Sequence, residues 1–395
     1  MLRPPQPAVY VFCLDVSRAA VETGYLKVFC DILQDELEKL PGDSRTQVGF
    51  ITYDRVCHFY SLPDGATQPT QLTVCDIDDM FLPSPSDLLV NLNECRGLVH
   101  QLLEELPSMF KDTNETQSAV GAALQAAYKM ASPTGGRVTV LQHTLPTVGP
   151  GAVTQREVQT SDKKADSAIL GPATDFYKKL ALDCSGKIKI LKDEKFVKFS
   201  LHFDDFFLTF SGQQVAVDVW TLGGNYVDLA TLTGISKFSG GQVQHFPGYH
   251  TVHNTPMAAK FEAALRRYLT RKIGFEAVMR IRCTRGLALH TFHGNFFVRS
   301  TDLLSLPNIN PDAGFGMQVS IEDDLRDSRE VTFQAALLYT SSKGERRIRV
   351  HTLCVPTSAS VPDIINSADQ QAVIGMLTKF GKSKKIVQKI SNCVM

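Results

Sequence analysis

Two arginines at alternate positions of one predicted strand are the residues best placed to bind a charged ligand. Residues 278–284 alternate polar and apolar side chains with period two, which predicts a β-strand. Arg280 and Arg282 then share one face about 6.6–6.8 Å apart, a spacing that suits an acidic peptide or a phosphate. Arginine binds such groups through paired hydrogen bonds. The same pattern also fits a solvated strand face that only needs polar residues.

A second predicted strand, residues 346–353, repeats this arrangement. Its apolar side chains, Ile348 and Val350, share one face. Its basic side chains share the other: Arg347, Arg349 and His351. Basic strand faces over an apolar underside suggest a β-sandwich that presents positive charge to a partner.

A candidate metal site follows the first apolar run, in Asp15-Val16-Ser17-Arg18-Ala19. Aspartate at the C-terminal end of a strand in an open α/β sheet lies where ligands bind. Von Willebrand A-type domains hold Mg²⁺ there with D-x-S-x-S, but Ala19 replaces the second serine. Hard cations need several oxygen ligands, so Asp15 and Ser17 are also explained as helix-capping or turn residues.

No catalytic motif is present in the sequence. Asp76, Asp78 and Asp79 form an acidic cluster, but no histidine or second motif supports a carboxylate catalyst, and a solvated loop or a partner contact explains it better. G-x-S-x-G and H-E-x-x-H are absent, and the paired glycines lack the G-x-G-x-x-G pattern. We therefore expect a protein that is not an enzyme.

The bulk properties predict a multidomain chain without a global charge bias. At 395 residues it exceeds one ordinary core. Lysine plus arginine and aspartate plus glutamate number 41 each, so any basic surface is local. Nine cysteines without a C-x-x-C pair, and no secretory leader, favour a reducing cytosolic compartment.

The first half of the chain alternates strands with helices, which predicts a mainly parallel sheet covered on both faces. Strands are expected at 8–14, 46–53, 56–60, 137–142, 215–222 and 242–246. Helices are expected at 24–40, 85–106, 116–130, 227–236 and 255–270. Residues 146–170 are polar and are expected to form a surface loop.

After residue 273 the pattern changes to short strands and turns. Strands are expected at 275–283, 287–293, 296–300, 315–321, 331–339 and 348–355, and a helical pattern begins at 358. We therefore predict an α/β domain over 6–247, a β-sandwich over 252–355 with a connecting helix at 255–270, and a helical segment over 356–395.

Several motifs together resemble the cargo-adaptor subunit of the COPII vesicle coat, over about residues 6–377. The segments that carry the resemblance are Leu14–Ser17, Gly49–Asp54, Gly171–Tyr177, Arg271–Glu276, His293–Ser300 and Arg346–Arg349. This family has a zinc finger, a von Willebrand A-like trunk, a β-sandwich, a helical domain and a gelsolin-like domain. The resemblance implies a non-enzymatic adaptor that lies on endoplasmic reticulum exit-site membranes and vesicles.

The resemblance also implies partners and site residues. The family pairs with the GTPase-activating coat subunit, is recruited by a Sar-type GTPase, contacts anionic membrane peripherally and binds export signals on the tails of cargo and SNARE proteins. Its pocket for acidic signals falls by motif on Arg280, Arg282 and Leu337. Further pocket arginines and the zinc finger fall before residue 1, so we expect an incomplete pocket and no zinc or other cofactor in this chain.

Two segments depart from the family pattern. Residues 186–211, rich in lysine, phenylalanine and leucine, are inserted between Ser185 and Gly212, and residues 379–395 form an unrelated basic tail. An apolar insertion between core elements either forms an extra hairpin or exposes phenylalanines and promotes aggregation. Two other functions remain as alternatives: an adhesion-type A domain that binds a protein through a metal ion, and a hydrolase using Asp15 or the 76–79 cluster.

Overall fold

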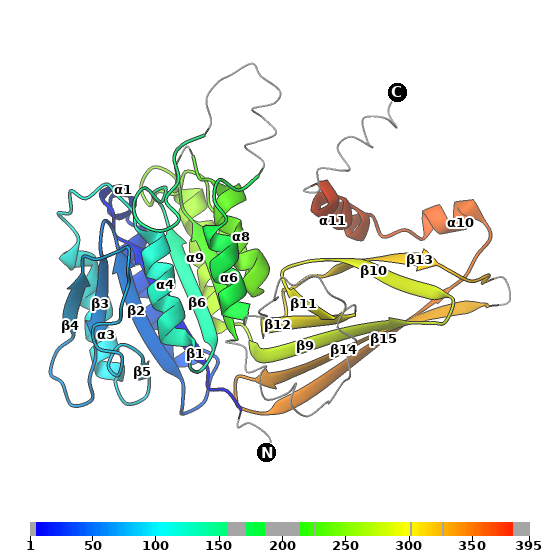
Figure 1. Ribbon diagram of the computed structural model, residues 1–395, viewed down its shortest axis with the longest axis horizontal. Helices are drawn as coiled ribbons and strands as arrows, with labels where there is room; N and C mark the ends of the chain where they lie inside the picture. Colours follow the sequence, from blue (N-terminus) through cyan, green and yellow to red (C-terminus); the bar gives the residue numbers. More distant parts are fainter. Residues whose placement is uncertain are drawn as a thin grey trace, which may run out of the picture. The chain divides into compact units, whose positions relative to one another are not determined.

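The computed structural model describes residues 5–156, 171–185, 214–224, 226–300, 302–325 and 328–381. The chain divides into two compact units (Figure 1). The first comprises residues 1–277, 306–311 and 339–347, and the second comprises residues 278–305, 312–338 and 348–395. The insertion at 186–211 and most of the basic tail lie outside the described residues.

A mainly parallel sheet forms the centre of the first unit, in the strand order β4-β3-β2-β1-β6-β7-β8 with β5 beside β2. Its strands are β1 Val9–Asp15, β2 Gln47–Tyr53, β3 Cys57–Ser61, β4 Thr70–Val74, β5 Val90–Asn91, β6 Gly136–Gln142, β7 Val215–Thr221 and β8 Val243–His245. Strands β2, β1, β6, β7 and β8 pair in parallel. Strands β3, β4 and β5 pair antiparallel.

Helices cover both faces of this sheet (Figure 1). The helices of the first unit are α1 Arg18–Glu22, α2 Tyr25–Glu36, the 3₁₀ turn Leu37–Lys39, α3 Arg96–Met109, α4 Val120–Ala131, α6 Phe176–Ser185, α8 Leu229–Ser239 and α9 Thr255–Thr270. Side chains of α2, α3 and α9 form one apolar cluster with the sheet, and those of α4, α6 and α8 form the other.

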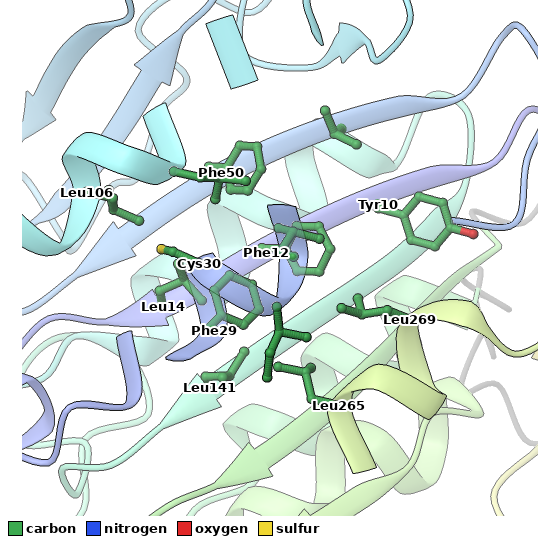
Figure 2. Close-up of a cluster of buried hydrophobic side chains, with 14 of the residues drawn as sticks. Tyr10, Phe12, Leu14, Phe29, Cys30, Phe50, Leu106, Leu141, Leu265 and Leu269 are labelled. Carbon is green, nitrogen blue, oxygen red and sulfur yellow. The ribbon is translucent and has the colours of Figure 1, made fainter. Parts of the chain in front are cut away.

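Strand β1 shows why the sequence folds this way, since all seven of its residues are buried. Its alternate residues enter different clusters: Tyr10, Phe12 and Leu14 the first, Val9, Val11 and Cys13 the second. In Figure 2, Phe12 lies among Phe29, Phe50 and Leu265, which come from α2, β2 and α9. A continuous apolar run is therefore what a central strand between two helical layers requires.

The β-sandwich region consists of two antiparallel sheets. Its strands are β9 Gly274–Cys283, β10 Leu287–His293, β11 Phe297–Ser300, β12 Leu303–Ile309, β13 Gly316–Ile321, β14 Glu330–Ser341 and β15 Arg346–Pro356. Strands β10 and β13 pair with each other, and the larger sheet has the order β11-β12-β9-β14-β15. Two helices follow, α10 Val361–Asn366 and α11 Gln370–Gly381.

The predicted fold class is confirmed, whereas one predicted helix was partly wrong and several elements were missed. The expected helix at 85–106 begins only at Arg96, because residues 90 and 91 pair with β2 instead. Strands β4 and β12 and helix α6 were not predicted. No helix in the described part of the chain combines the length and hydropathy needed to cross a bilayer.

Candidate functional site

The alternation predicted around the arginine pair is present in strand β9. Met279 and Ile281 are buried, whereas Arg280 and Arg282 are exposed. Burial of the odd-numbered side chains fixes the orientation of the strand, because slipping by one residue would bury both guanidinium groups. The apolar underside therefore holds two positive charges on one accessible face.

Arg280 forms an ion pair with Asp302. Its Nε and Nη2 atoms both lie 2.6 Å from Asp302 Oδ2. Asp302 stands immediately before strand β12, the neighbour of β9. The side chains are 47% and 36% exposed, so solvent screens this pair and its net contribution to stability is small.

Arg282 differs from Arg280 in its surroundings. Within the described residues it makes no ion pair or hydrogen bond through its side chain, and it is exposed. Its guanidinium can therefore bind a ligand without first losing an internal partner. The two arginines thus share a strand face but are not equivalent.

Leu337 lies on strand β14, next to β9, and is half-buried. Two contacts relate these strands: the backbone N–H of Thr284 donates to the Thr332 carbonyl at 3.0 Å, and Thr340 Oγ1 lies 3.3 Å from Glu276 Oε2. The number of residues from Glu276 to Thr284 on β9 equals the number from Thr332 to Thr340 on β14, so the register between the strands is constant over this stretch. Alternation then puts Leu337 level with Met279, on the opposite face from the two arginines.

Strand β15 is the edge of the larger sheet, and all of its residues are exposed. Ile348 is 69% exposed and Val350 is 54% exposed. On the basic face, Arg347 Nε donates to Glu345 Oε2 at 2.9 Å. This strand therefore presents apolar side chains as well as charge, unlike β9, whose apolar side is covered.

The candidate metal residue Asp15 is fully buried and already satisfied by backbone amides. The N–H of Ser17 donates to Oδ1 at 3.0 Å. The N–H groups of His143 and Thr144 donate to Oδ2 at 3.0 and 2.8 Å. Burial raises the pKa of Asp15, and these hydrogen bonds oppose the rise. Asp15 therefore joins the end of β1 to the loop after β6.

The surroundings of Asp15 do not fit a bound cation. The Ser17 hydroxyl lies 2.6 Å from Thr144 Oγ1, and Ala19 supplies no oxygen. A divalent cation needs several oxygen ligands, but Asp15 Oδ2 already accepts two hydrogen bonds and Oδ1 accepts one. The chemistry of this residue set argues against the metal-dependent adhesion function.

The acidic cluster is a surface loop. Asp76, Asp78 and Asp79 are exposed, and the Asp79 N–H donates to Asp76 Oδ1 at 3.3 Å. Buried Met80 and half-buried Ile77 hold this loop to the second apolar cluster. The geometry matches the solvated loop that the sequence favours over a carboxylate catalyst.

Asp302 is the residue that sequence reasoning missed. The signal was a short apolar strand, 303–309, next to an acidic residue, but Pro307 lies within it and proline disfavours strand predictions. Without β12 as a neighbour of β9, nothing in the sequence placed a carboxylate beside Arg280.

Comparison with known proteins gives matches over nearly the whole chain. The model of the Sec23/Sec24 trunk domain matches residues 5–191 and 186–269, and that of the Sec23/Sec24 beta-sandwich domain matches residues 274–358. The two trunk matches meet where the insertion begins. The second trunk match ends at residue 269, within helix α9.

Individual relatives agree with the domain models. The protein transport protein Sec24A of Bos taurus is 55% identical over 99% of this chain, and Sec24B of Homo sapiens is 54% identical over 99%. The chain spans 33% and 29% of their lengths. The crystal structure of the human COPII-coat protein Sec24c superposes with a TM-score of 0.81 at 29% identity, covering 96% of this chain and 47% of that chain.

Proposed function

Because the chain belongs to the Sec23/Sec24 family and contains its trunk and beta-sandwich domains, we propose that it acts as a cargo adaptor of the COPII coat. In this function it is not an enzyme. It binds export signals on cytosolic tails of cargo and SNARE proteins, and it pairs with the GTPase-activating coat subunit in a complex with a Sar-type GTPase. Its site of action is the endoplasmic reticulum exit-site membrane, which it contacts peripherally.

The observation that carries the cargo site is the accessible arginine pair of β9 over a buried apolar underside. An extended peptide repeats its side-chain direction every second residue, as β9 does. Two carboxylates separated by one residue therefore match the two guanidinium groups. Leu337, on the neighbouring strand β14, contributes to the apolar underside, level with Met279.

The first experiment measures binding of a peptide with two glutamates separated by one residue, by fluorescence anisotropy. Charge-assisted hydrogen bonds contribute about 1.5–3 kcal/mol each, and less at an exposed site. We expect weak binding, about hundreds of micromolar, that is lost in the double variant Arg280→Ala and Arg282→Ala.

A matched control removes two arginines from another strand face. The double variant Arg347→Ala and Arg349→Ala on β15 lowers the net charge equally and should keep most of the affinity. Equal affinity of the parent and the Arg280→Ala, Arg282→Ala variant, both with unchanged circular dichroism, would rule out the β9 site.

A second experiment tests the coat partnership. We expect the purified chain to co-elute with the GTPase-activating coat subunit in gel filtration at tens of micromolar, and the β9 double variant to co-elute equally well. Absence of the complex, with a native circular dichroism spectrum, would contradict the proposed pairing and leave the peptide result to be judged by itself.

A further inference from the structure

We propose that Asp302 is a specificity-determining residue of the β9 site, where it competes with acidic ligands for Arg280. The inference rests on the proposed function, since it concerns selectivity at the same site. The observation behind it is the ion pair in which Asp302 Oδ2 accepts a hydrogen bond from Nε of Arg280 and lies 2.6 Å from Nη2.

The geometry of the pair determines what a ligand meets. A guanidinium group offers paired donors along its edges, and a carboxylate engages one edge at a time. Asp302 occupies the Nε–Nη2 edge of Arg280. A ligand carboxylate must displace Asp302 or bind the remaining edge beside a negative charge, and each alternative reduces its affinity.

Exposure of the pair makes the exchange feasible. Arg280 and Asp302 retain 47% and 36% of their side-chain accessibility, so water can solvate Asp302 when it is released. An exposed ion pair of this kind contributes only modestly to the free energy of folding, so a ligand can displace it. Asp302 therefore weakens binding to Arg280 without blocking it.

The unequal surroundings of the arginines give the site its selectivity. Asp302 is tethered beside Arg280 and has a high effective concentration there, so a ligand with a single carboxylate competes poorly. Within the described residues, Arg282 makes no internal ion pair, and it anchors the first carboxylate. Once Arg282 holds the first carboxylate, the second carboxylate of the same peptide is also tethered near Arg280. It then competes with Asp302 at a comparable effective concentration. The arrangement favours ligands with two acidic groups at alternate positions.

The test compares the parent with Asp302→Asn, using the same diglutamate peptide and fluorescence anisotropy. Removing the competing charge while keeping the side-chain shape should tighten binding by about two- to fivefold. The gain should shrink at high salt, because both partners are exposed. Asp302→Glu, which keeps the charge, should behave like the parent.

Three controls separate competition from a structural effect. In an Arg280→Gln background, Asp302→Asn should give no gain, since the residue on which the charges compete is gone. A peptide with glutamines in place of both glutamates should show no gain either. Asp363→Asn, which removes an exposed aspartate from helix α10, should leave affinity unchanged.

The outcomes distinguish this inference from the proposed function. If peptide binding requires the arginines but its affinity is equal for the parent and Asp302→Asn, the role of Asp302 is overturned and the proposed cargo site stands. A gain that persists in the Arg280→Gln background would overturn it as well. Absence of peptide binding by both the parent and Asp302→Asn, with native melting curves, would overturn the inference together with the proposed cargo site.

Discussion

A buried arginine in the trunk connects three structural elements. Arg137 on β6 is 3% exposed at its side chain, and its Nε donates to Asp218 Oδ2 on β7 at 2.8 Å. The Tyr268 hydroxyl of α9 donates to the same carboxylate at 2.7 Å. The guanidinium carbon lies 3.5 Å from the centre of the Tyr268 ring. The buried Arg137 guanidinium therefore neutralises the charge of the Asp218 carboxylate inside the fold.

Arg137→Ala should strongly destabilise the trunk, because it leaves the Asp218 carboxylate buried without its counter-charge. Removing one partner of a buried pair costs about 3–5 kcal/mol, measurable by urea unfolding. Arg45→Ala, which breaks the exposed pair with Asp43, should cost less than about 1 kcal/mol. Similar losses for both variants would contradict this account.

Among single residues, the sequence predicted side-chain direction better than side-chain pairing. Period two was sufficient to place Arg280 and Arg282 on the exposed face of β9. The face occupied by Leu337 depends on the register between β9 and β14. The partner of Arg280 depends on β12 lying beside β9. Both are long-range relations that local alternation does not contain.

At the scale of elements, helices α2 and α9 are joined by a charge cluster. Arg266 on α9 donates to Glu36 Oε1 and Asp35 Oδ2 at 2.9 Å each, and lies 3.3 Å from Glu262. Lys39 Nζ is 2.8 Å from Glu36 Oε2. Hydrogen bonds from Lys39 and Arg266 lower the pKa of Glu36, against the opposing effect of burial.

The lowered pKa of Glu36 predicts a pH-dependent contribution to stability. A carboxylate with a depressed folded-state pKa stabilises the fold above its unfolded value, here 4.5, and loses this effect as pH falls through the folded value. Glu36→Gln should therefore lower the free energy of unfolding at pH 7, and the difference should vanish in acid. Glu104→Gln, exposed on α3, serves as the control. A constant Glu36→Gln effect across pH would contradict the prediction.

The edge strand β15 predicts self-association. Within the described residues no strand pairs with its outer edge, Ile348 and Val350 are exposed on it, and such edges pair with other chains. Ile348→Lys with Val350→Lys should reduce sedimenting oligomers without lowering the melting temperature. Val361→Lys removes a similarly exposed apolar side chain from helix α10. If Val361→Lys is equally effective, apolar exposure rather than the strand edge is the cause.

At the scale of the molecule, periodicity predicted the change from an α/β domain to a β-sandwich. The continuous apolar runs of β1, β6 and β7 become strands buried on both faces, and helix α9 has its predicted bounds. The expected helix at 85–106 failed over 85–95, where pairing of β5 with β2 overrides local helical spacing. Elements fixed by their own periodicity were predictable, and those fixed by a distant partner were not.

The inserted segment 186–211 gives the last prediction, which concerns the stability of the whole trunk. Every trunk strand and helix described above lies outside it: α6 ends at Ser185 and β7 begins at Val215. Deleting 186–211 joins these elements through Gly212, Gln213 and Gln214, a common length for a helix-to-strand loop. The segment carries six phenylalanines, and exposed aromatic side chains promote aggregation.

We expect the deletion to raise the melting temperature and reduce light scattering. Replacing 186–211 by glycine and serine of equal length should reproduce the lower scattering, because loop length alone changes stability little. An unchanged or lower melting temperature after deletion would show that the segment packs into the trunk.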